Sequence, residues 1–298
     1  MAVDVIAYLD RSREAVDAYL QKVVPPPERF PRPLFEAMRY SLFAGGKRIR
    51  PALAFGAAEA VGGPAGAALP FAAALEMIHT YSLIHDDLPA MDDDDLRRGK
   101  PTSHRVYGEG IAILAGDALL TDAFWVLTRP EVLAEHPAER VVRAVEVIAR
   151  AAGSPGMVAG QALDLVCEGR AVDLATVEFL HVHKTGALIR AATVVGGLAA
   201  GGAEADIERL GRYAERLGLA FQIADDVLDV EGTTEELGKP AGSDQGRSKA
   251  TYPAVVGLEE AKVRARELMG EALECLDPFG ERAEPLRALA RFVVERQH

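Results

Sequence analysis

The amino-acid sequence predicts an all-α protein. Alanine, leucine, valine and glutamate dominate it, and aromatic residues make up only 6% of the chain. The alternating pattern of a half-buried strand is scarce, whereas apolar residues recur at helical spacing. The 298 residues and the 49% hydrophobic content suffice for one large core or two modest ones. No linker or change of composition divides the chain, so we expect a single domain over residues 1–298.

Charge and cysteine content exclude several functional classes. The formal net charge of −12 argues against nucleic acid as a partner, because a phosphate backbone needs a basic face. Cys167 and Cys275 lack metal-ligand spacing and fit a reduced, cytoplasmic setting. The N-terminus carries Asp4 and Asp10 and is not typical of a signal peptide. The uncharged, glycine-rich run 191–203 is shorter than the ~20 residues that cross a bilayer, so no membrane span is expected.

Start and stop signals divide the chain into helices. Pro25-Pro26-Pro27 ends the first helix, Gly45-Gly46 ends the second, and an almost wholly apolar pattern makes 65–85 a central helix. A polar, glycine-rich loop at 236–246 has the composition of a lid. The expected helices cover 3–23, 33–45, 65–85, 109–128, 138–152, 155–168, 173–200, 204–230, 257–276 and 281–297.

The stretch from Asp86 to Lys100 holds the densest charge in the chain. It places six carboxylates within ten residues and then three cations within four. Carboxylates this crowded repel one another unless a cation intervenes, and hard oxygen ligands suit Mg²⁺ together with substrate phosphates. The adjoining Arg97 and Arg98 have the geometry to bind phosphate oxygens. The alternative is a solvated acidic loop followed by a basic turn.

Local geometry brings two of these acids together. An unbroken helix would put Asp86 and Asp92 about 120° apart. Pro89 removes a backbone donor, so we expect a turn at 88–91 that returns Asp92 beside Asp86. His79 lies two helical turns before Asp86 and within about 20° of the same face. It is either a hydrogen-bonded core histidine or a ligand of a diphosphate.

A second acidic group lies on the expected helix 204–230. Gln222, Asp225, Asp226 and Asp229 follow the i, i+3, i+4, i+7 pattern and share one face of a mostly apolar helix. Three carboxylates on such a face pack poorly without a cation, which makes this a second candidate metal site. The alternative is a solvent-facing stripe of an amphipathic helix.

Cationic residues form two further candidate sites. Lys47, Arg48 and Arg50 follow a Gly-Gly junction and make a compact anion site, unless they only neutralise a helix end. Lys184, followed by Thr185, is expected in mid-helix among apolar residues, where a lysine is costly unless it is paired.

Taken together, these residues resemble the short-chain trans-prenyl diphosphate synthases. The match runs from about residue 35 to 255, and six motifs occur in the family's order. They are Gly45-Gly46-Lys47-Arg48-Ile49-Arg50-Pro51, Asp86-Asp87-x4-Asp92 with Leu96-Arg97-Arg98-Gly99, Gly160-Gln161-x2-Asp164, His183-Lys184-Thr185-Gly186, Phe221-Gln222-x2-Asp225-Asp226-x2-Asp229 and Gly238-Lys239.

The resemblance implies an isoprenoid synthase-type helical bundle around a central cavity, as a homodimer, with Mg²⁺ as cofactor. It implies metal ligands at Asp86, Asp87, Asp92, Asp225, Asp226 and Asp229. It implies an allylic diphosphate site at Arg97, Lys184, Thr185, Gln222 and Lys239, of which Lys184, Thr185 and Gln222 are catalytic. It implies a site for isopentenyl diphosphate at Lys47, Arg50, His79 and Arg98.

The implied reaction condenses isopentenyl diphosphate with dimethylallyl or geranyl diphosphate by ionisation, condensation and elimination. In this family the residues before the first aspartate pair set the floor of the cavity, here Tyr81 and Ser82. Helix geometry puts Ser82 about 40° and Tyr81 about 140° from Asp86, so Tyr81 only partly blocks the cavity. Tyr81 and the Pro89-Ala90 insertion favour farnesyl diphosphate as product. Geranylgeranyl diphosphate, a class I terpene cyclase and a non-catalytic partner subunit are the alternatives.

Overall fold

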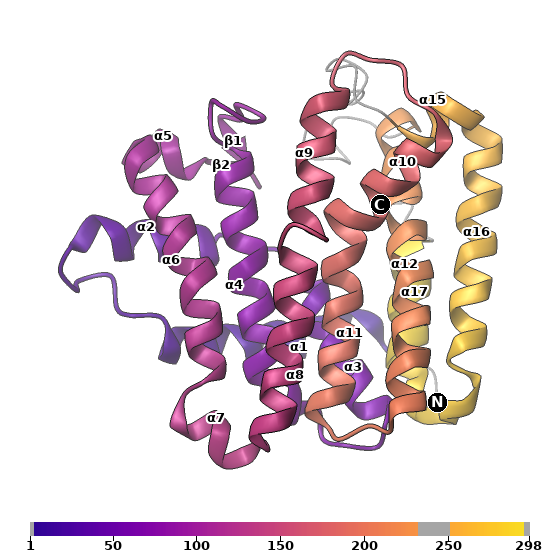
Figure 1. Ribbon diagram of the computed structural model, residues 1–298, viewed down its shortest axis with the longest axis horizontal. Helices are drawn as coiled ribbons and strands as arrows, with labels where there is room; N and C mark the ends of the chain where they lie inside the picture. The colour runs from indigo at the N-terminus through magenta and orange to yellow at the C-terminus, as the bar shows by residue number, and fades with distance from the viewer. Residues whose placement is uncertain (1–2, 232–250, 295–298) are drawn as a thin grey trace.

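The computed structural model describes residues 3–231 and 251–294, and the described chain is almost entirely helical (Figure 1). This confirms the predicted fold class. The α-helices are α1 (Val5–Val23), α2 (Arg32–Leu42), α3 (Ile49–Ala60), α4 (Leu69–Asp86), α5 (Ser103–Tyr107), α6 (Glu109–Leu127), α7 (Pro130–Glu135), α8 (Ala138–Ala152), α9 (Met157–Cys167), α10 (Leu174–Leu180), α11 (Ala187–Ala199), α12 (Glu204–Glu231), α15 (Tyr252–Val256), α16 (Leu258–Cys275) and α17 (Glu284–Val294).

Short elements complete the described chain. A π-helical turn, η2 (His181–Gly186), joins α10 to α11, and the 3₁₀ turns η1 (Ala65–Ala68) and η3 (Asp277–Ala283) precede α4 and α17. The strands β1 (Leu96–Arg97) and β2 (Lys100–Pro101) form an antiparallel hairpin beyond the end of α4 (Figure 1).

Helix α4 is the buried centre of one half of the bundle. Pro70 occupies its first turn, where the missing N–H costs nothing, and Phe71, Leu75 and Ile78 are fully inaccessible. Helices α3, α6 and α11 pack against it. The one buried acid within it, Glu76, is paired with Arg48 at 2.7 Å. Arg48 is therefore a structural cation rather than a free member of the anion site.

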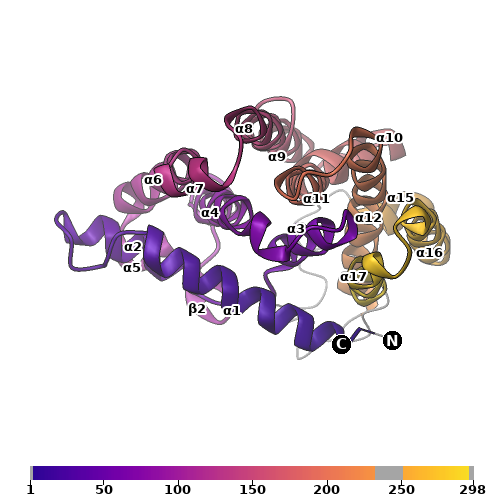
Figure 2. The same ribbon diagram turned by 90° about the horizontal axis from the view of Figure 1, so that it is seen from below.

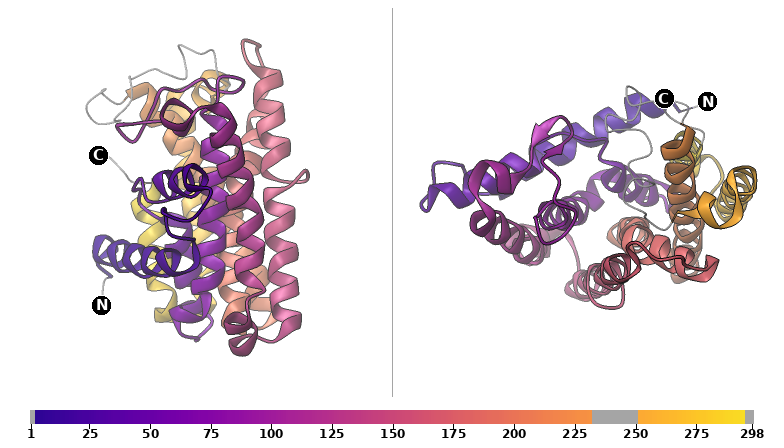
Figure 3. Two further views of the ribbon diagram at one scale, coloured as in Figure 1. Left: turned by 90° about the vertical axis from the view of Figure 1, so that its left-hand side faces the viewer. Right: turned by 90° about the horizontal axis from the view of Figure 1, so that it is seen from above.

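The long helices run side by side, and the N-terminal helix crosses them. Seen from below, α4, α6, α8, α9 and α11 appear nearly end-on, whereas α1 lies across one side of the bundle (Figure 2). Figure 3 shows α1 crossing in the same way from two other directions. Helix α12 packs on α11 and α16, which places its acidic face in the half of the molecule opposite α4.

Several features differ from the sequence prediction, and the short helices α5, α7 and α15 were not expected. Helix α3 was not predicted either, and it carries Pro51 in its first turn, where a proline is tolerated. The single helix expected at 173–200 is interrupted by η2. The last helix begins at Glu284 rather than at 281, because the residues before it form the 3₁₀ turn η3. The hairpin forms because Arg98 and Gly99 both take positive φ, as a two-residue type I′ turn requires.

Two helical stretches of the described chain are long and apolar enough to cross a membrane. The stretch 65–86, which contains α4, is 72% buried inside the protein and is a core helix. The stretch 109–135, which contains α6, is only 39% buried. Helix α6 therefore turns an apolar face away from the core.

Candidate active site

The C-terminal end of α4 delivers Asp86, and the chain then turns back on itself as predicted. The backbone N–H of Met91 donates to the carbonyl of Leu88 at 2.9 Å, which closes a turn that contains Pro89. The N–H of Asp92 then donates to the carbonyl of Asp86, also at 2.9 Å. The two acids that a continuous helix would separate thus lie side by side.

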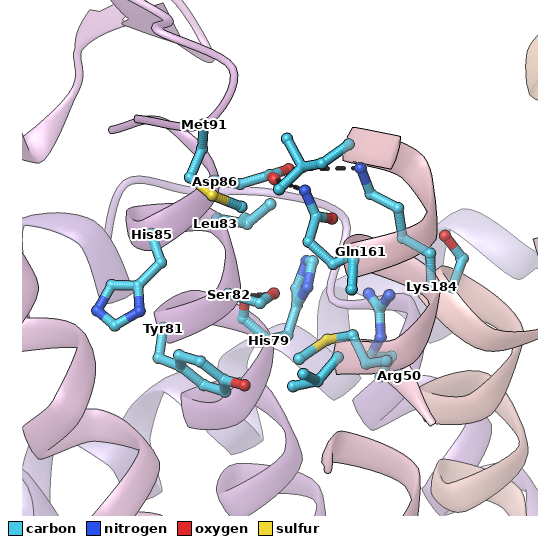
Figure 4. Close-up of a pocket in the computed structure, with 15 residues that line it drawn as sticks. Arg50, His79, Tyr81, Ser82, Leu83, His85, Asp86, Met91, Gln161 and Lys184 are labelled. Atoms are coloured by element: carbon cyan, nitrogen blue, oxygen red, sulfur yellow. Dashed lines mark hydrogen bonds and ion pairs between the residues drawn. The ribbon is translucent and has the colours of Figure 1, made fainter. Parts of the chain in front are cut away.

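Asp86 faces residues from two other helical segments (Figure 4). Gln161 Nε2, on α9, donates to Asp86 Oδ1 at 2.6 Å. Lys184 Nζ, on η2, lies 3.9 Å from Asp86 Oδ2 and donates to Asp164 Oδ2 at 2.6 Å. The predicted motifs on α4, α9 and η2 therefore meet at one point.

The charge of Lys184 is stabilised by these neighbours. Burial lowers the pKa of the Lys184 ammonium, but the carboxylates of Asp86 and Asp164 raise it, and the net direction is upward. Lys184 is consequently a fixed cation at neutral pH, and the pairing expected of a buried lysine is present.

The side chain of Asp87 pairs with Arg97 and not with the residues that contact Asp86. Its Oδ1 accepts from Arg97 Nε at 2.7 Å and lies 2.6 Å from Arg97 Nη2, and the aspartate is only 3% exposed. Asp87 and Arg97 line a small pocket on α4 that does not include Asp86. Burial raises the pKa of Asp87, and the Arg97 guanidinium opposes that shift.

The acidic face of α12 meets η2 rather than open solvent. Thr185 Oγ1 donates to Gln222 Oε1 at 2.8 Å, and His181 Nε2 lies 2.9 Å from Asp226 Oδ2. Asp225 is partly buried and Asp229 is 2% exposed.

His181 did not appear among the predicted site residues. A signal for it exists, because His181 precedes Thr185 by four residues, the same spacing that separates Gln222 from Asp226. Two i, i+4 pairs on facing helical segments can form two contacts at once.

A cavity of about 360 Å³ lies beneath Asp86, with its polar groups gathered at the top and at the back (Figure 4). The predicted floor residues Tyr81 and Ser82 both line it, although helix geometry placed Tyr81 about 140° from Asp86. The residues that line the cavity are Arg50, His79, Tyr81, Ser82, Leu83, His85, Asp86, Met91, Met157, Val158, Gln161, Ala162, Leu165, Lys184 and Thr185.

The predicted second anion site lies along the same cavity. Arg50 is partly buried, and its Nε atom is buried with no hydrogen-bond partner among the described residues. His79 lines the cavity beside it. Burial lowers the pKa of His79 well below its usual range, and the charge of Arg50 lowers it further. A buried arginine donor without a partner beside a neutral histidine is suited to an anionic ligand.

Of the other predicted cations, the two that the structure describes, Arg98 and Lys47, do not line this cavity. Arg98 donates to the carbonyl of Gly45, which ties the β1–β2 hairpin to the Gly-Gly junction. The ammonium of Lys47 lies 5.5 Å from the centre of the Phe292 ring. Lys239 and the expected lid at 236–246 lie outside the described residues.

The donor set fits a magnesium ion that is shared with a diphosphate. Among residues 3–231 and 251–294, no three His, Cys, Asp or Glu side chains gather closely enough to cage a metal by themselves. The site instead offers carboxylates at the end of α4 and along α12. Mg²⁺ is usually held by one or two carboxylates and completed by substrate phosphates and water.

Comparison with known proteins identifies the family of the chain. The family described as Polyprenyl synthetase matches residues 31–284. A dimethylallyltranstransferase of Fischerella ambigua is 48% identical over 98% of this chain and 83% of its own. A geranylgeranyl diphosphate synthase of Cyanophora paradoxa is 48% identical over 99% of this chain and 97% of its own.

A solved structure extends the comparison to the fold. The geranyltransferase of Helicobacter pylori, determined in complex with magnesium and isoprenyl diphosphate, superposes with a TM-score of 0.86. It is 32% identical and the match covers 99% of both chains. The chain described here belongs to the polyprenyl synthetase family of prenyl diphosphate-forming transferases.

Proposed function

We propose that this protein is a Mg²⁺-dependent prenyltransferase that condenses isopentenyl diphosphate with dimethylallyl and then geranyl diphosphate to give farnesyl diphosphate. One observation carries the proposal. Asp86, Gln161 and Lys184 meet at the polar mouth of an apolar cavity, along which Arg50 and His79 provide a second, separate anion site. A transferase that joins two diphosphates needs two such sites.

The allylic diphosphate would bind at the mouth, between Asp86 and Asp92 on one side and Asp225 on the other. Magnesium, when bound there, neutralises the charge that develops on the departing diphosphate. Lys184 is a fixed cation in the same place and stabilises that charge without reorganisation. The hydroxyl of Thr185 and the amide oxygen of Gln222 lie together beside it.

The second substrate would bind through Arg50 and His79. Once the allylic C–O bond has broken, the double bond of the second substrate attacks the resulting allylic cation, and the proton then lost from the new chain passes to the released diphosphate. The apolar cavity excludes water that would otherwise capture the allylic cation. No protein nucleophile takes part in this sequence.

An incubation series tests the reaction class. Purified protein receives geranyl diphosphate and Mg²⁺, with and without isopentenyl diphosphate. We expect farnesyl diphosphate only when both substrates and the metal are present. Consumption of geranyl diphosphate without the second substrate would identify a cyclase, and absence of turnover by the purified chain would identify a non-catalytic subunit.

The product length separates farnesyl from geranylgeranyl diphosphate synthesis. Tyr81 is 8% exposed and meets the His85 ring edge-on with 5.6 Å between ring centres, so its phenol occupies the lower part of the cavity. This favours the shorter product, whereas the small Ser82 beside it and the relatives named for geranylgeranyl diphosphate favour the longer one. Product analysis with dimethylallyl, geranyl and farnesyl diphosphates as starters decides between them.

We further propose that the protein is a homodimer joined through α6. The outward face of this helix exposes Ile113, Leu114 and Trp125, at 41%, 54% and 52%. Asp117 and Asp122 lie on the same helix, which argues against contact with lipid. A second copy of the chain would cover the face by placing α6 against its equivalent.

A further inference from the structure

The π turn η2 is joined to α12 by two contacts in antiparallel register. His181 meets Asp226 at one end of the turn, and Thr185 meets Gln222 at the other. His181 and Thr185 are four residues apart on η2, and Gln222 and Asp226 are four residues apart on α12. Because the contacts bracket Lys184, they fix both ends of the segment that carries it.

The contact with Asp226 is buried and shared. The side chains of His181 and Asp226 are 9% and 13% exposed. The backbone N–H of Tyr252, at the start of α15, donates to the same Oδ2 atom of Asp226 at 2.7 Å. The hydroxyl of Tyr252 also donates to Glu178 on α10, at 3.2 Å. One carboxylate oxygen thus joins three segments: η2, α12 and α15.

The backbone of η2 also packs closely against α9 and α12. A Cβ atom added to Gly160 on α9 would lie 2.3 Å from the backbone nitrogen of Lys184. A Cβ added to Gly218 on α12 would lie 3.0 Å from Gly186. The backbone of the turn is therefore held between α9 and α12, and a change on the α12 side alters the position of Lys184.

We propose that His181 is a positioning residue, which through Asp226 keeps the π turn in register with α12 and so holds Lys184 beside Asp86. Asp226 is then the anchor of the turn rather than a ligand of magnesium. π turns inserted in α-helices are frequent at functional sites. In η2, the contact between His181 and Asp226 explains why such a turn is kept. The inference rests on the proposed function, because Lys184 is assigned there to the allylic diphosphate.

The first test compares two substitutions of His181. His181→Leu removes the donor, whereas His181→Gln keeps an N–H near the position of Nε2. For His181→Leu we expect kcat/KM for geranyl diphosphate to fall about 10- to 100-fold, because a displaced Lys184 is no longer aligned with the diphosphate. The KM for isopentenyl diphosphate should stay within about 2-fold, since Arg50 and His79 lie on α3 and α4 rather than on the turn. His181→Gln should recover most of the loss.

The second test uses binding rather than turnover. The thermal midpoint is measured with and without Mg²⁺ and inorganic pyrophosphate for Asp226→Asn and Asp225→Asn. The asparagine oxygen at 226 can still accept from both His181 and Tyr252, so we expect a stabilisation close to that of the wild type. Asp225→Asn should lose most of it. Equal losses in the two variants would make Asp226 a ligand and overturn the proposal.

His183→Leu is the matched control for the His181 variants. His183 lies in the same turn, but its Nδ1 is 2.8 Å from the carbonyl of Phe179 and its ring stacks on Phe179. His183→Leu should change neither the kinetics nor the stabilisation by Mg²⁺ and pyrophosphate. Wild-type protein without activity and without that stabilisation contradicts the proposed function. Active wild type with an equally active His181→Leu, or with a His181→Gln no better than His181→Leu, contradicts only the role of His181.

Discussion

The side chain of Asp87 is held by Arg97 and that of Asp226 pairs with His181, whereas the turn at Pro89 brings Asp92 back beside Asp86. At the scale of single residues, two predictions follow, one for Tyr81 and one for His79.

The first concerns Tyr81 and product length. Its phenol fills the lower part of the cavity, so Tyr81→Ala should remove the obstruction and yield products longer than those of the wild type. Product chain lengths are measured by chromatography after incubation with farnesyl and isopentenyl diphosphates. Tyr107→Ala is the matched control, because Tyr107 packs against Tyr40 and does not line the cavity. An unchanged product distribution in Tyr81→Ala would reject Tyr81 as the floor.

The second concerns His79 and pH. Burial and the nearby charge of Arg50 lower its pKa in the folded protein well below the 6.5 of the unfolded chain. As pH falls, His79 therefore binds a proton in the unfolded chain before it does so in the folded protein. The stability that comes from keeping His79 neutral in the folded protein is present above pH 6.5 and is lost below it. At one pH unit below that value the loss reaches at most about 1.4 kcal/mol.

Comparison with His79→Gln isolates this loss. Between pH 7.5 and 5.5, the free energy of unfolding should fall by about 1.4 kcal/mol more in the wild type than in the variant. Urea unfolding at the two pH values measures it. An equal fall in both proteins would show that His79 is protonated in the folded state or exposed to solvent.

At the scale of elements, the long helices were predictable and their interruptions were not. The boundaries of α4, α6 and α8 follow from apolar spacing, glycine and proline, which act locally. The π turn η2 has no such local signal, because the close approach of Gly160 to the backbone of Lys184 is a tertiary contact. Substitution of this glycine tests the approach directly.

Gly160→Ala should displace the turn. The added Cβ would meet the nitrogen and Cα of Lys184 at 2.3 and 2.7 Å, and both are backbone atoms that cannot rotate away. A displacement of about 1 Å at a catalytic group costs about 100-fold in rate, so we expect a fall of that order in kcat/KM. Gly270→Ala on α16 is the control, since nothing lies within 4 Å of its Cβ position. Equal kinetics in the two variants would contradict the packing.

Helix α6 gives a prediction about assembly. The wild type should have about twice the 31.8 kDa mass of one chain in sedimentation equilibrium. The double substitution Leu114→Asp and Trp125→Glu should yield monomers, because it places charge in an apolar contact. Val263→Asp, at a 39% exposed position on α16, should leave the mass unchanged. A monomeric wild type at micromolar concentration would reject the α6 interface.

For the whole molecule, the architecture was predictable because composition and periodicity act over the entire chain. The facing arrangement of α4 and α12 was implied only by the resemblance to a family, since no local signal specifies how two helices more than 100 residues apart are placed. The structure brings their motifs together through α9 and η2. The pairing of Asp87 with Arg97 and of Asp226 with His181 could not be predicted, because both contacts depend on where a second segment packs. In the proposed function, carboxylates from both helices hold one metal–diphosphate group.

Anomalous diffraction from crystals grown with Mn²⁺ in place of Mg²⁺, together with pyrophosphate, tests whether both helices bind that group. We predict manganese peaks between the end of α4 and the acidic face of α12, with Asp86 and Asp225 among the ligands and Lys184 on the pyrophosphate. Manganese bound only at Asp93 and Asp95, which are exposed, or pyrophosphate bound away from Asp86, would contradict it.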